Sequence, residues 1–359
     1  MLVLGIETSC DETCAAVIDG DGRVLSDVVH SQVELHAPYG GVVPELASRD
    51  HLRNARPVVE AAIERAGIEL RALDGIAVTC RPGLSGALLV GVQLAQGLAF
   101  ALEKPLVGVD HLVGHLLAGF LRYPDQPASA QPAFPFVALL VSGGHTALYY
   151  VAGPELGQVR ELGATRDDAA GEAFDKVAKL LGLGYPGGPV VDRLAREGNP
   201  ERVPLSAPMP AANSAEFSFS GLKTNVARYV EAEGRPGDDQ RLRDLCAAFQ
   251  RRVVDTLVKK AVAAARREGV QALVIGGGVA ANRELRERAG VACAAHGITL
   301  YVPSLRACTD NAAMIAYAGS VRLARGENDG FRIETSPDTA LLQVTKKGRG
   351  RRGMRLPGA

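Results

Sequence analysis

The chain has 359 residues, of which 47% are apolar and 22% are charged, and these values are typical of a globular protein with a sizeable aliphatic core. Its 40 basic and 40 acidic residues balance, so net charge gives no indication of a nucleic-acid partner, and any such contact must come from a local patch. Six cysteines without a CxxC pair favour reduced thiols over a disulfide framework. The first residues lack a basic signal region and no apolar run approaches the roughly 20 residues of a membrane span, so we expect a cytoplasmic protein with no membrane segment.

The first third of the chain alternates strand and helix patterns. A buried apolar run predicts a strand at 2–7, and two apolar runs around a Gly/Asp turn predict a hairpin over 14–29. Helical apolar spacing then predicts helices from His51 to Ala66 and from Leu84 to Leu102. Gly67 directly follows the first of these helices and is a natural C-cap.

The strand–turn–strand opening recurs about 135 residues later, over 136–152. The recurrence predicts an α/β protein with a duplicated lobe, each copy having helices after its strands. The elements expected in the second copy are helices at 168–181, 242–268 and 311–323 and a buried strand at 272–276.

Composition also predicts where the copies divide. The Pro-rich stretch 123–132 has the character of an inter-lobe linker. We therefore expect an N-terminal lobe over 1–125, a C-terminal lobe with a helical insertion over 133–325, and a C-terminal segment over 326–359. Residues 346–355 hold six basic residues, three glycines and no acid, which predicts a disordered tail.

Two histidines with helical spacing form the first candidate site. His111 and His115 are four residues apart, so a helix would place both on one face, within reach of one cation. Leu112 stands where a zinc peptidase has its general-base glutamate, so the pattern does not indicate a peptidase. Asp310 is a candidate third ligand, and two imidazoles with one carboxylate suit an open iron or zinc site. The alternative is structural, with the histidines as polar residues near a helix start capped by Asp110, and Asp310 as another helix cap.

Two glycine-rich turns form the second candidate site. The run from Leu140 through Val141, Ser142 and Gly143 to Gly144 follows a strand, and its backbone N–H groups could approach a phosphate. Residues 276–283 run from a strand through three glycines toward a helix, which suits a nucleotide packed against backbone. Neither segment is a GxGxxG fingerprint or a P-loop, and an ordinary hairpin or close helix–strand packing would have the same pattern.

An acidic helix is the third candidate. Asp168, Glu172, Asp175 and Lys176 have helical spacing, and a solvated, ion-paired surface competes with recognition of ribose hydroxyls by these acids. The pattern identifies no general base. Glu12 and Lys176 are candidates for catalytic roles beside the metal site.

Together these segments resemble the bacterial tRNA N6-adenosine threonylcarbamoyltransferase family. The resemblance extends in order over about residues 1–325, and its motifs are specific, with the expected residue type at every ligand position. The matching segments are Gly5–Thr13, Gly40–Arg49, His111 with His115, Val141–Thr146, Gly171–Lys176, Phe217–Thr224, Gly276–Arg283 and Thr309–Asn311.

The resemblance implies an actin/sugar-kinase/heat-shock ATPase fold, with two duplicated lobes of mixed sheets flanked by helices and a central cleft. It implies that His111, His115 and Asp310 bind one Fe²⁺, or Zn²⁺ in its place. It further implies that an AMP- or ATP-like nucleotide moiety of the substrate binds at a set of nine residues, namely Leu140, Val141, Ser142, Gly143, Gly144, Asp175, Gly188, Asp192 and Asn282.

The reaction implied is transfer of threonylcarbamoyl from its adenylate to the exocyclic amine of the adenosine 3′ of the anticodon, in tRNAs that read codons beginning with A, with release of AMP. The implied partners are tRNA, a catalytically inactive TsaB-like paralogue, a small TsaE-like ATPase and a TsaC-like synthase that supplies the adenylate. A small-molecule kinase of the same fold and an ATP-dependent interaction switch are the alternatives. The histidine pair with Asp310 argues against a kinase, which has no use for it.

Overall fold

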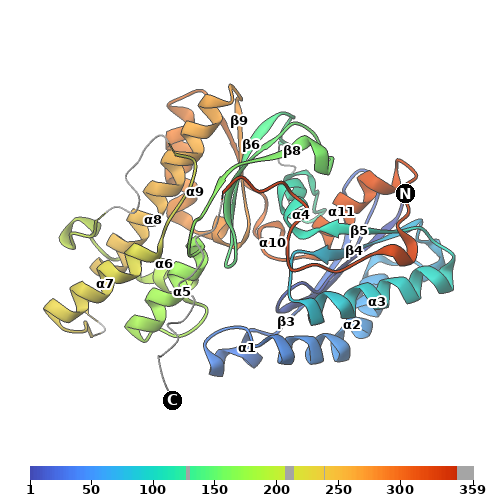
Figure 1. The fold of residues 1–359 in the computed structure, drawn as a ribbon, viewed down its shortest axis with the longest axis horizontal. Coiled ribbons are helices and arrows are strands. Elements are labelled where there is room, and N and C mark those ends of the chain that lie inside the picture. The colour runs from blue at the N-terminus through green and yellow to red at the C-terminus, as the bar shows by residue number, and fades with distance from the viewer. Residues whose placement is uncertain (127–129, 207–213, 238, 346–359) are drawn as a thin grey trace, which may run out of the picture.

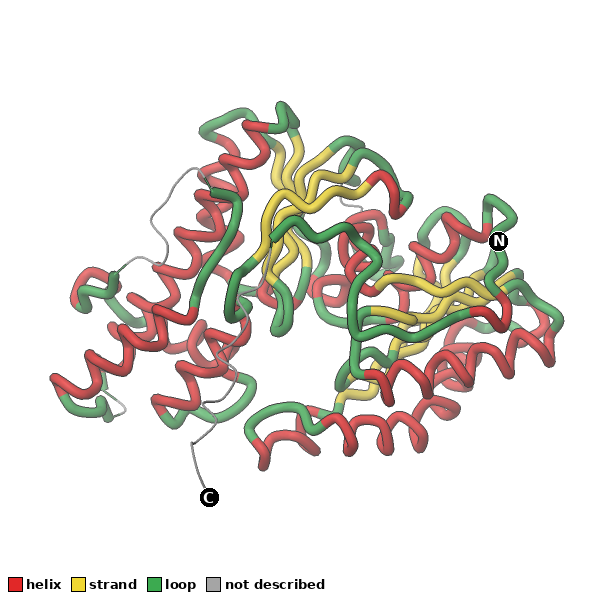
Figure 2. Tube along the Cα trace, in the orientation of Figure 1, coloured by secondary structure: helices red, strands yellow, loops and turns green. Residues whose placement is uncertain are grey.

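The computed structural model describes residues 1–126, 130–206, 214–237 and 239–345. These residues form two α/β halves, each built on a five-stranded mixed sheet (Figures 1 and 2). The first sheet has the order β3-β2-β1-β4-β5 and the second the order β10-β9-β6-β7-β8. In each sheet three consecutive antiparallel strands are followed by two parallel ones, so the second sheet repeats the topology of the first and the predicted duplication is confirmed.

The bounds of the elements agree with most of the expected ones. The strands are β1 (Val3–Glu7), β2 (Glu12–Ile18), β3 (Val24–Ser31), β4 (Gly75–Arg81), β5 (Leu106–Asp110), β6 (Phe136–Val141), β7 (Thr146–Val151), β8 (Val159–Ala164), β9 (Ala272–Gly276) and β10 (Thr299–Tyr301). The helices are α1 (Val33–His36), α2 (Pro44–Ala66), α3 (Ser85–Leu102), α4 (His111–Leu117), α5 (Ala170–Leu181), α6 (Gly187–Ala195), α7 (Ser220–Glu233), α8 (Gln240–Arg267), α9 (Arg283–Ala294), α10 (Leu305–Cys308) and α11 (Ala312–Leu323).

The five predicted helix starts all shift, four of them by one or two residues and that of α2 by seven. Helix α2 begins at Pro44, seven residues before the expected His51, because the fixed φ of proline suits the first turn of a helix. The helix also contains Pro57 in its interior. Helix α5 begins at Ala170 and leaves Asp168 in the preceding turn, where the Asp168 carbonyl accepts a bond from the Thr165 hydroxyl. The C-cap at Gly67 is confirmed, with the left-handed conformation that glycine adopts without steric cost.

The two sheets share one core, and two short helices lie inside it. A single buried cluster joins the two sheets. It contains α4 and α11 together with apolar side chains of β1 and β2 from the first sheet and of β6, β7 and β9 from the second. Helix α11 lies against β1 and β4, while α4 contacts β5, β6 and α11. The helices α2 and α3 cover the opposite face of the first sheet, and α8 lies in the core of the second half (Figure 1). The N-terminal ends of α4 and α11 are therefore held where the halves meet.

Among the described helices, α3 with its 18 residues is long and apolar enough to cross a membrane by length and composition alone, which differs from the expectation that no such run occurs. Ala87, Leu88, Val92 and Ala95 of α3 are buried against the first sheet, which is how a core helix of a folded lobe packs. All six cysteines lie in the described part of the chain and are free, as predicted.

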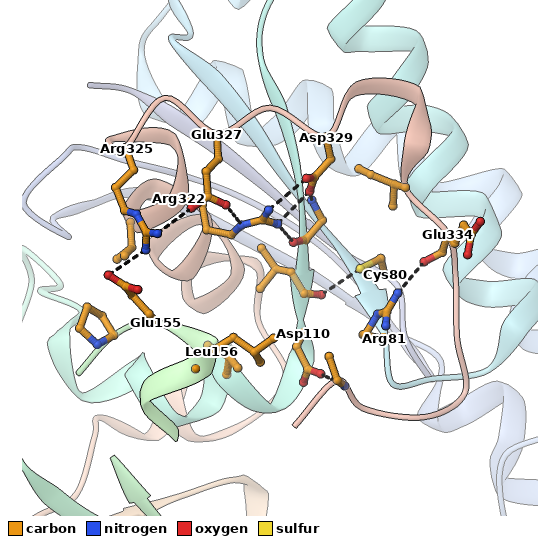
Figure 3. A pocket seen from close by; sticks show the side chains of 18 of the residues that line it. Cys80, Arg81, Asp110, Glu155, Leu156, Arg322, Arg325, Glu327, Asp329 and Glu334 are labelled. Carbon is orange, nitrogen blue, oxygen red and sulfur yellow. Dashed lines mark hydrogen bonds and ion pairs between the residues drawn. The ribbon is translucent and has the colours of Figure 1, made fainter. Parts of the chain in front are cut away.

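The described part of the C-terminal segment begins along β5, one of the two edge strands of the first sheet. Asp329 accepts a bond of 2.8 Å from the Gly108 amide and pairs with both Nη atoms of Arg322 (Figure 3). Farther on, Thr339 and the amide of Ala340 donate to the carboxylate of Asp110. The segment borders a cavity of about 590 Å³ whose arginines Arg322 and Arg325 are paired with carboxylates. The expected disordered tail lies outside the described residues, and the lobe boundaries stay a prediction.

The Asp329 contacts predict a pH dependence of stability. Burial alone would raise the pKa of Asp329, but bonds from Arg322 and the Gly108 amide outweigh it and hold this pKa below its ordinary value. A lowered carboxyl pKa stabilises the fold above the unfolded-state pKa of about 4, and this contribution is lost as the pH falls through the lower folded-state value.

We expect Asp329→Asn to be less stable than the parent chain by a constant amount between about pH 5 and 7, with the difference closing below about pH 4. Urea unfolding of both proteins at a series of pH values measures this difference in the free energy of unfolding. A difference that stayed the same down to pH 3 would show that the carboxylate charge is not what stabilises the segment.

Candidate metal and nucleotide site

The two predicted histidines share one face of α4, a helix that begins directly after β5. Asp110 ends the strand and caps the helix by accepting a bond of 3.0 Å from the Leu112 amide, so its predicted capping role is confirmed. His111 and His115 are 7% and 1% exposed, and their ring centroids are 4.7 Å apart. The i,i+4 spacing thus brings both imidazoles together in a buried position.

Asp310 completes the cluster from the loop between α10 and α11. Its Oδ1 atom lies 3.1 Å from Nε2 of His115 and 3.5 Å from Nε2 of His111. Asn311, and not Asp310, caps α11, because the Asn311 side chain accepts the bond from the Met314 amide. The structure therefore brings the three predicted ligands together and leaves the Asp310 carboxylate facing the imidazoles.

The surroundings of the three side chains fit a divalent cation. Their candidate ligand atoms lie within 4.8 Å of one another, and in the described part of the chain no other such group of His, Cys, Asp and Glu occurs. Nδ1 of His115 is buried without a hydrogen-bond partner, so this imidazole is not fully satisfied by protein atoms alone. Two imidazoles and one carboxylate form the ligand set of open iron and zinc sites.

Electrostatics at the cluster also favour positive charge. Burial alone would raise the pKa of Asp310, but attraction to His111 and hydrogen bonds with both imidazoles hold it well below its ordinary value. Burial likewise opposes a charged His111, yet Asp310 and Glu7 raise the pKa of His111 well above its ordinary value. Burial lowers the pKa of His115, which leaves that imidazole neutral, as a metal ligand requires.

Two glutamates lie beside the cluster. Glu7, at the end of β1, has its Oε2 atom 2.8 Å from Nδ1 of His111, a contact the sequence reasoning missed because the partners are 104 residues apart. Glu12, at the start of β2, has its pKa raised to about 9 by burial and by the neighbouring carboxylates of Asp310 and Asp11. A mostly protonated Glu12 can donate a hydrogen bond near neutral pH, which suits the catalytic candidacy assigned to it.

The two predicted glycine-rich turns pack against each other. Gly277 follows β9 with a φ of +87°, and a Cβ at this position would lie 2.5 Å from the carbonyl oxygen of Val141, the last residue of β6. Only glycine allows this backbone approach. By contrast, a Cβ at Gly143, Gly144 or Gly188 would meet no atom within 4 Å, so these backbones are open to a ligand.

The polar residues predicted to bind a nucleotide fall into two groups. Asp175 accepts a bond of 2.7 Å from the Gly187 amide and so fixes the turn into α6. Asp192 and Asn282 are joined directly, with Oδ1 of Asp192 3.2 Å from Nδ2 of Asn282. Gln250 of α8 contacts both of them and is 2% exposed; sequence analysis missed it, since one glutamine in a long helix carries no signal.

Lys176 lies in an ion-paired surface group. Its Nζ atom is 2.6 Å from Asp168 and 2.9 Å from Glu172. These pairs fit the structural alternative raised for this helix, although an ammonium group on a half-exposed surface can exchange partners. Within the part of the chain that the structure describes, no contact joins Lys176 to the His/His/Asp cluster, and its catalytic candidacy stays a prediction.

Comparison with known proteins decides the family. Residues 23–317 match the family model TsaD, described as tRNA N6-adenosine threonylcarbamoyltransferase. The chain belongs to the tRNA N6-adenosine threonylcarbamoyltransferase family. A member of this family from Sorangium cellulosum is 64% identical over 98% of this chain and 100% of its own length, and one from Anaeromyxobacter dehalogenans strain 2CP-C is 53% identical over 93% and 98%.

Solved structures confirm the fold alone. Component A of the Acidaminococcus fermentans (R)-2-hydroxyglutaryl-CoA dehydratase superposes with a TM-score of 0.52 at 14% identity, covering 89% of this chain and 99% of its own. HypF from T. kodakarensis gives 0.58 at 14% identity, with coverage of 92% and 48%. The predicted actin-like ATPase architecture, with two mixed sheets flanked by helices, is therefore confirmed for this family member.

Proposed function

We propose that this chain transfers the threonylcarbamoyl group from threonylcarbamoyl-adenylate to the exocyclic amine of the adenosine 3′ of the anticodon in tRNAs reading codons that begin with A, and releases AMP. The observation that carries the proposal is the 64% identity, over nearly the whole chain, to a relative that bears the name of this activity. The buried His111/His115/Asp310 cluster and the two packed glycine turns support it.

The chemistry requires two reactants to be held in line. An aromatic exocyclic amine is a weak nucleophile, so binding both substrates in reacting geometry and stabilising the developing negative charge supply most of the rate enhancement. The open backbones of Gly143 and Gly144, next to Ser142 and with Leu140 and Val141 behind them, are suited to cradle the AMP phosphate. In this proposal the ribose and base are surrounded by four residues, namely Asp175, Gly188, Asp192 and Asn282.

The metal has a defined place in the proposal. His111, His115 and Asp310 would hold one Fe²⁺, with Zn²⁺ as the alternative, and a cation there would supply Lewis-acid stabilisation of an acyl oxygen or of the threonyl group. The protein's own contribution is to keep both imidazoles buried at one edge of the site and to exclude bulk water from it. Glu12, which lies close to Asp310, is the candidate for a further catalytic role in this proposal.

The partners follow from the same proposal. The acceptor is tRNA, and the donor comes from a TsaC-like synthase. The further partners are a catalytically inactive TsaB-like paralogue and a small TsaE-like ATPase. The reaction takes place in the cytoplasm and involves no membrane. No observation favours a small-molecule kinase or an ATP-dependent switch over this assignment.

Nucleoside mass spectrometry tests the function. Unmodified tRNA is incubated with metal-loaded chain, preformed threonylcarbamoyl-adenylate and the partner proteins, and a parallel reaction omits only this chain. We expect the threonylcarbamoyl mass increment on adenosine only when the chain is present. Equal modification in both reactions, or none in either with tRNA and adenylate intact, would overturn the proposal.

A further inference from the structure

Glu7 is a buried carboxylate beside the proposed metal site, and its side chain is 1% exposed. Three donors surround it. The Ser9 amide lies 2.5 Å from Oε1, and both the Thr79 hydroxyl, at 2.6 Å, and Nδ1 of His111, at 2.8 Å, lie next to Oε2. A carboxylate is costly to bury unless it is fully hydrogen-bonded, and here each oxygen is satisfied.

The contact with His111 has a consequence for the imidazole. A carboxylate accepts from an N–H group, so Nδ1 of His111 keeps its proton, and Nε2 is the nitrogen that offers its lone pair to a cation when the imidazole is neutral. Nε2 is the atom that faces Asp310, at 3.5 Å. Because Glu7 lies at the rigid end of a central strand and is itself held by Thr79 of the adjacent strand β4, the imidazole is fixed in both tautomer and ring orientation.

We infer that Glu7 is a positioning residue for the metal site, which sets the tautomer of His111 and raises its affinity for a divalent cation. The inference rests on the metal site of the proposed function but concerns cation affinity, which is measured without tRNA or adenylate. Failure of the transfer reaction therefore leaves this inference standing, and the reverse holds as well.

A purely structural role is the competing explanation. Glu7 and His111 join β1 to α4 as a buried pair, and such a pair could serve only to fix the helix on the sheet. That role predicts that removing the carboxylate destabilises the fold but leaves the cation affinity of the folded protein unchanged.

The substitution Glu7→Gln separates the two roles. Glutamine keeps the size of the side chain but has one oxygen, so its amide NH₂ must oppose either the Ser9 amide or the Thr79 and His111 donors. Glu161→Gln is the matched control, because Glu161 is also buried, at 4% exposure, and accepts backbone bonds from Val344 and Thr345 in the second half.

The experiment measures Zn²⁺ affinity of the full chain by competition with a chromophoric chelator, with folding monitored by circular dichroism. We expect Glu7→Gln to weaken Zn²⁺ binding by about 10- to 100-fold and Glu161→Gln to leave it within about threefold. The visible spectrum of bound Co²⁺ should change in the first variant only, since it reports ligand geometry.

Unchanged Zn²⁺ affinity and an unchanged Co²⁺ spectrum in folded Glu7→Gln would overturn the inference. If this variant does not fold, Thr79→Val decides, because it keeps Glu7 and removes one donor that holds it. We then expect a severalfold weaker affinity in Thr79→Val, and parent-like affinity would count against a positioning role.

Discussion

Replacing Asp310 by alanine is expected to remove stoichiometric metal and to lower the rate of threonylcarbamoyl transfer by about 10²- to 10³-fold, the scale of losing one preorganised electrostatic stabiliser. Asp310 is the carboxylate that both buried imidazoles face, at 3.1 and 3.5 Å, and its loss leaves His111 and His115 without their shared anion. Metal content by elemental analysis and single-turnover transfer measure the two effects on one sample.

A control for this experiment is Asp21→Ala, which removes a carboxylate that is 86% exposed at the tip of the β2–β3 hairpin. The Asp21→Ala variant should keep the metal content and the transfer rate of the parent chain. Metal-free Asp310→Ala with the parent rate would refute the role given to the cluster, whereas metal-loaded Asp310→Ala with a low rate would move that role from metal binding to the carboxylate itself.

Gly277→Ala is expected to weaken binding of the adenylate about tenfold or more while the protein stays folded. An added Cβ would lie 2.5 Å from the Val141 carbonyl, and the φ of +87° is unfavourable for alanine by about 1 kcal/mol or more. The strand end that carries Val141 and Ser142 must therefore shift, and it is the backbone proposed to approach the AMP phosphate.

Gly290→Ala in α9 is the control, because a Cβ there meets no atom within 4 Å, its φ lies outside the left-handed region, and it lies outside the segment proposed to bind the nucleotide. Calorimetric titration with AMP and thermal unfolding of both variants test the expectation. Equal affinity in the two variants would show that the contact between the glycine turns does not shape the nucleotide site, and global unfolding of Gly277→Ala alone would assign the contact to stability.

The sequence predicted the parts of the fold that local patterns control. The Gly/Asp turn between β2 and β3, the recurrence of the same opening at β6 and β7, and the C-cap at Gly67 follow from turn chemistry and apolar periodicity. The histidine pair was predicted from spacing alone, since an i,i+4 pair is a property of one helix. Helix α2 was predicted too short, because the charged residues before His51 weaken its apolar period.

The remainder depends on contacts between distant segments. Asp310 lies 195 residues from His115, so the sequence could offer it only as a candidate ligand, and the resemblance to a family was needed to choose that role over a helix cap. Glu7 reaches His111 across the first sheet, and Gln250 of α8 reaches Asn282 and Asp192 from a third segment. None of these three has a local pattern, because each is placed by the order of strands in a sheet and by the packing of α8.

The most direct test of the central claim is the stoichiometry of transfer. The metal-loaded chain, its partners and unmodified tRNA are mixed with adenylate made from labelled threonine, and label in tRNA and free AMP are counted in one quenched reaction. We predict one label per AMP released in the reaction catalysed by this chain, all of it on the adenosine 3′ of the anticodon. AMP release without label in tRNA, or phosphoryl transfer from ATP with the adenylate untouched, would contradict the account.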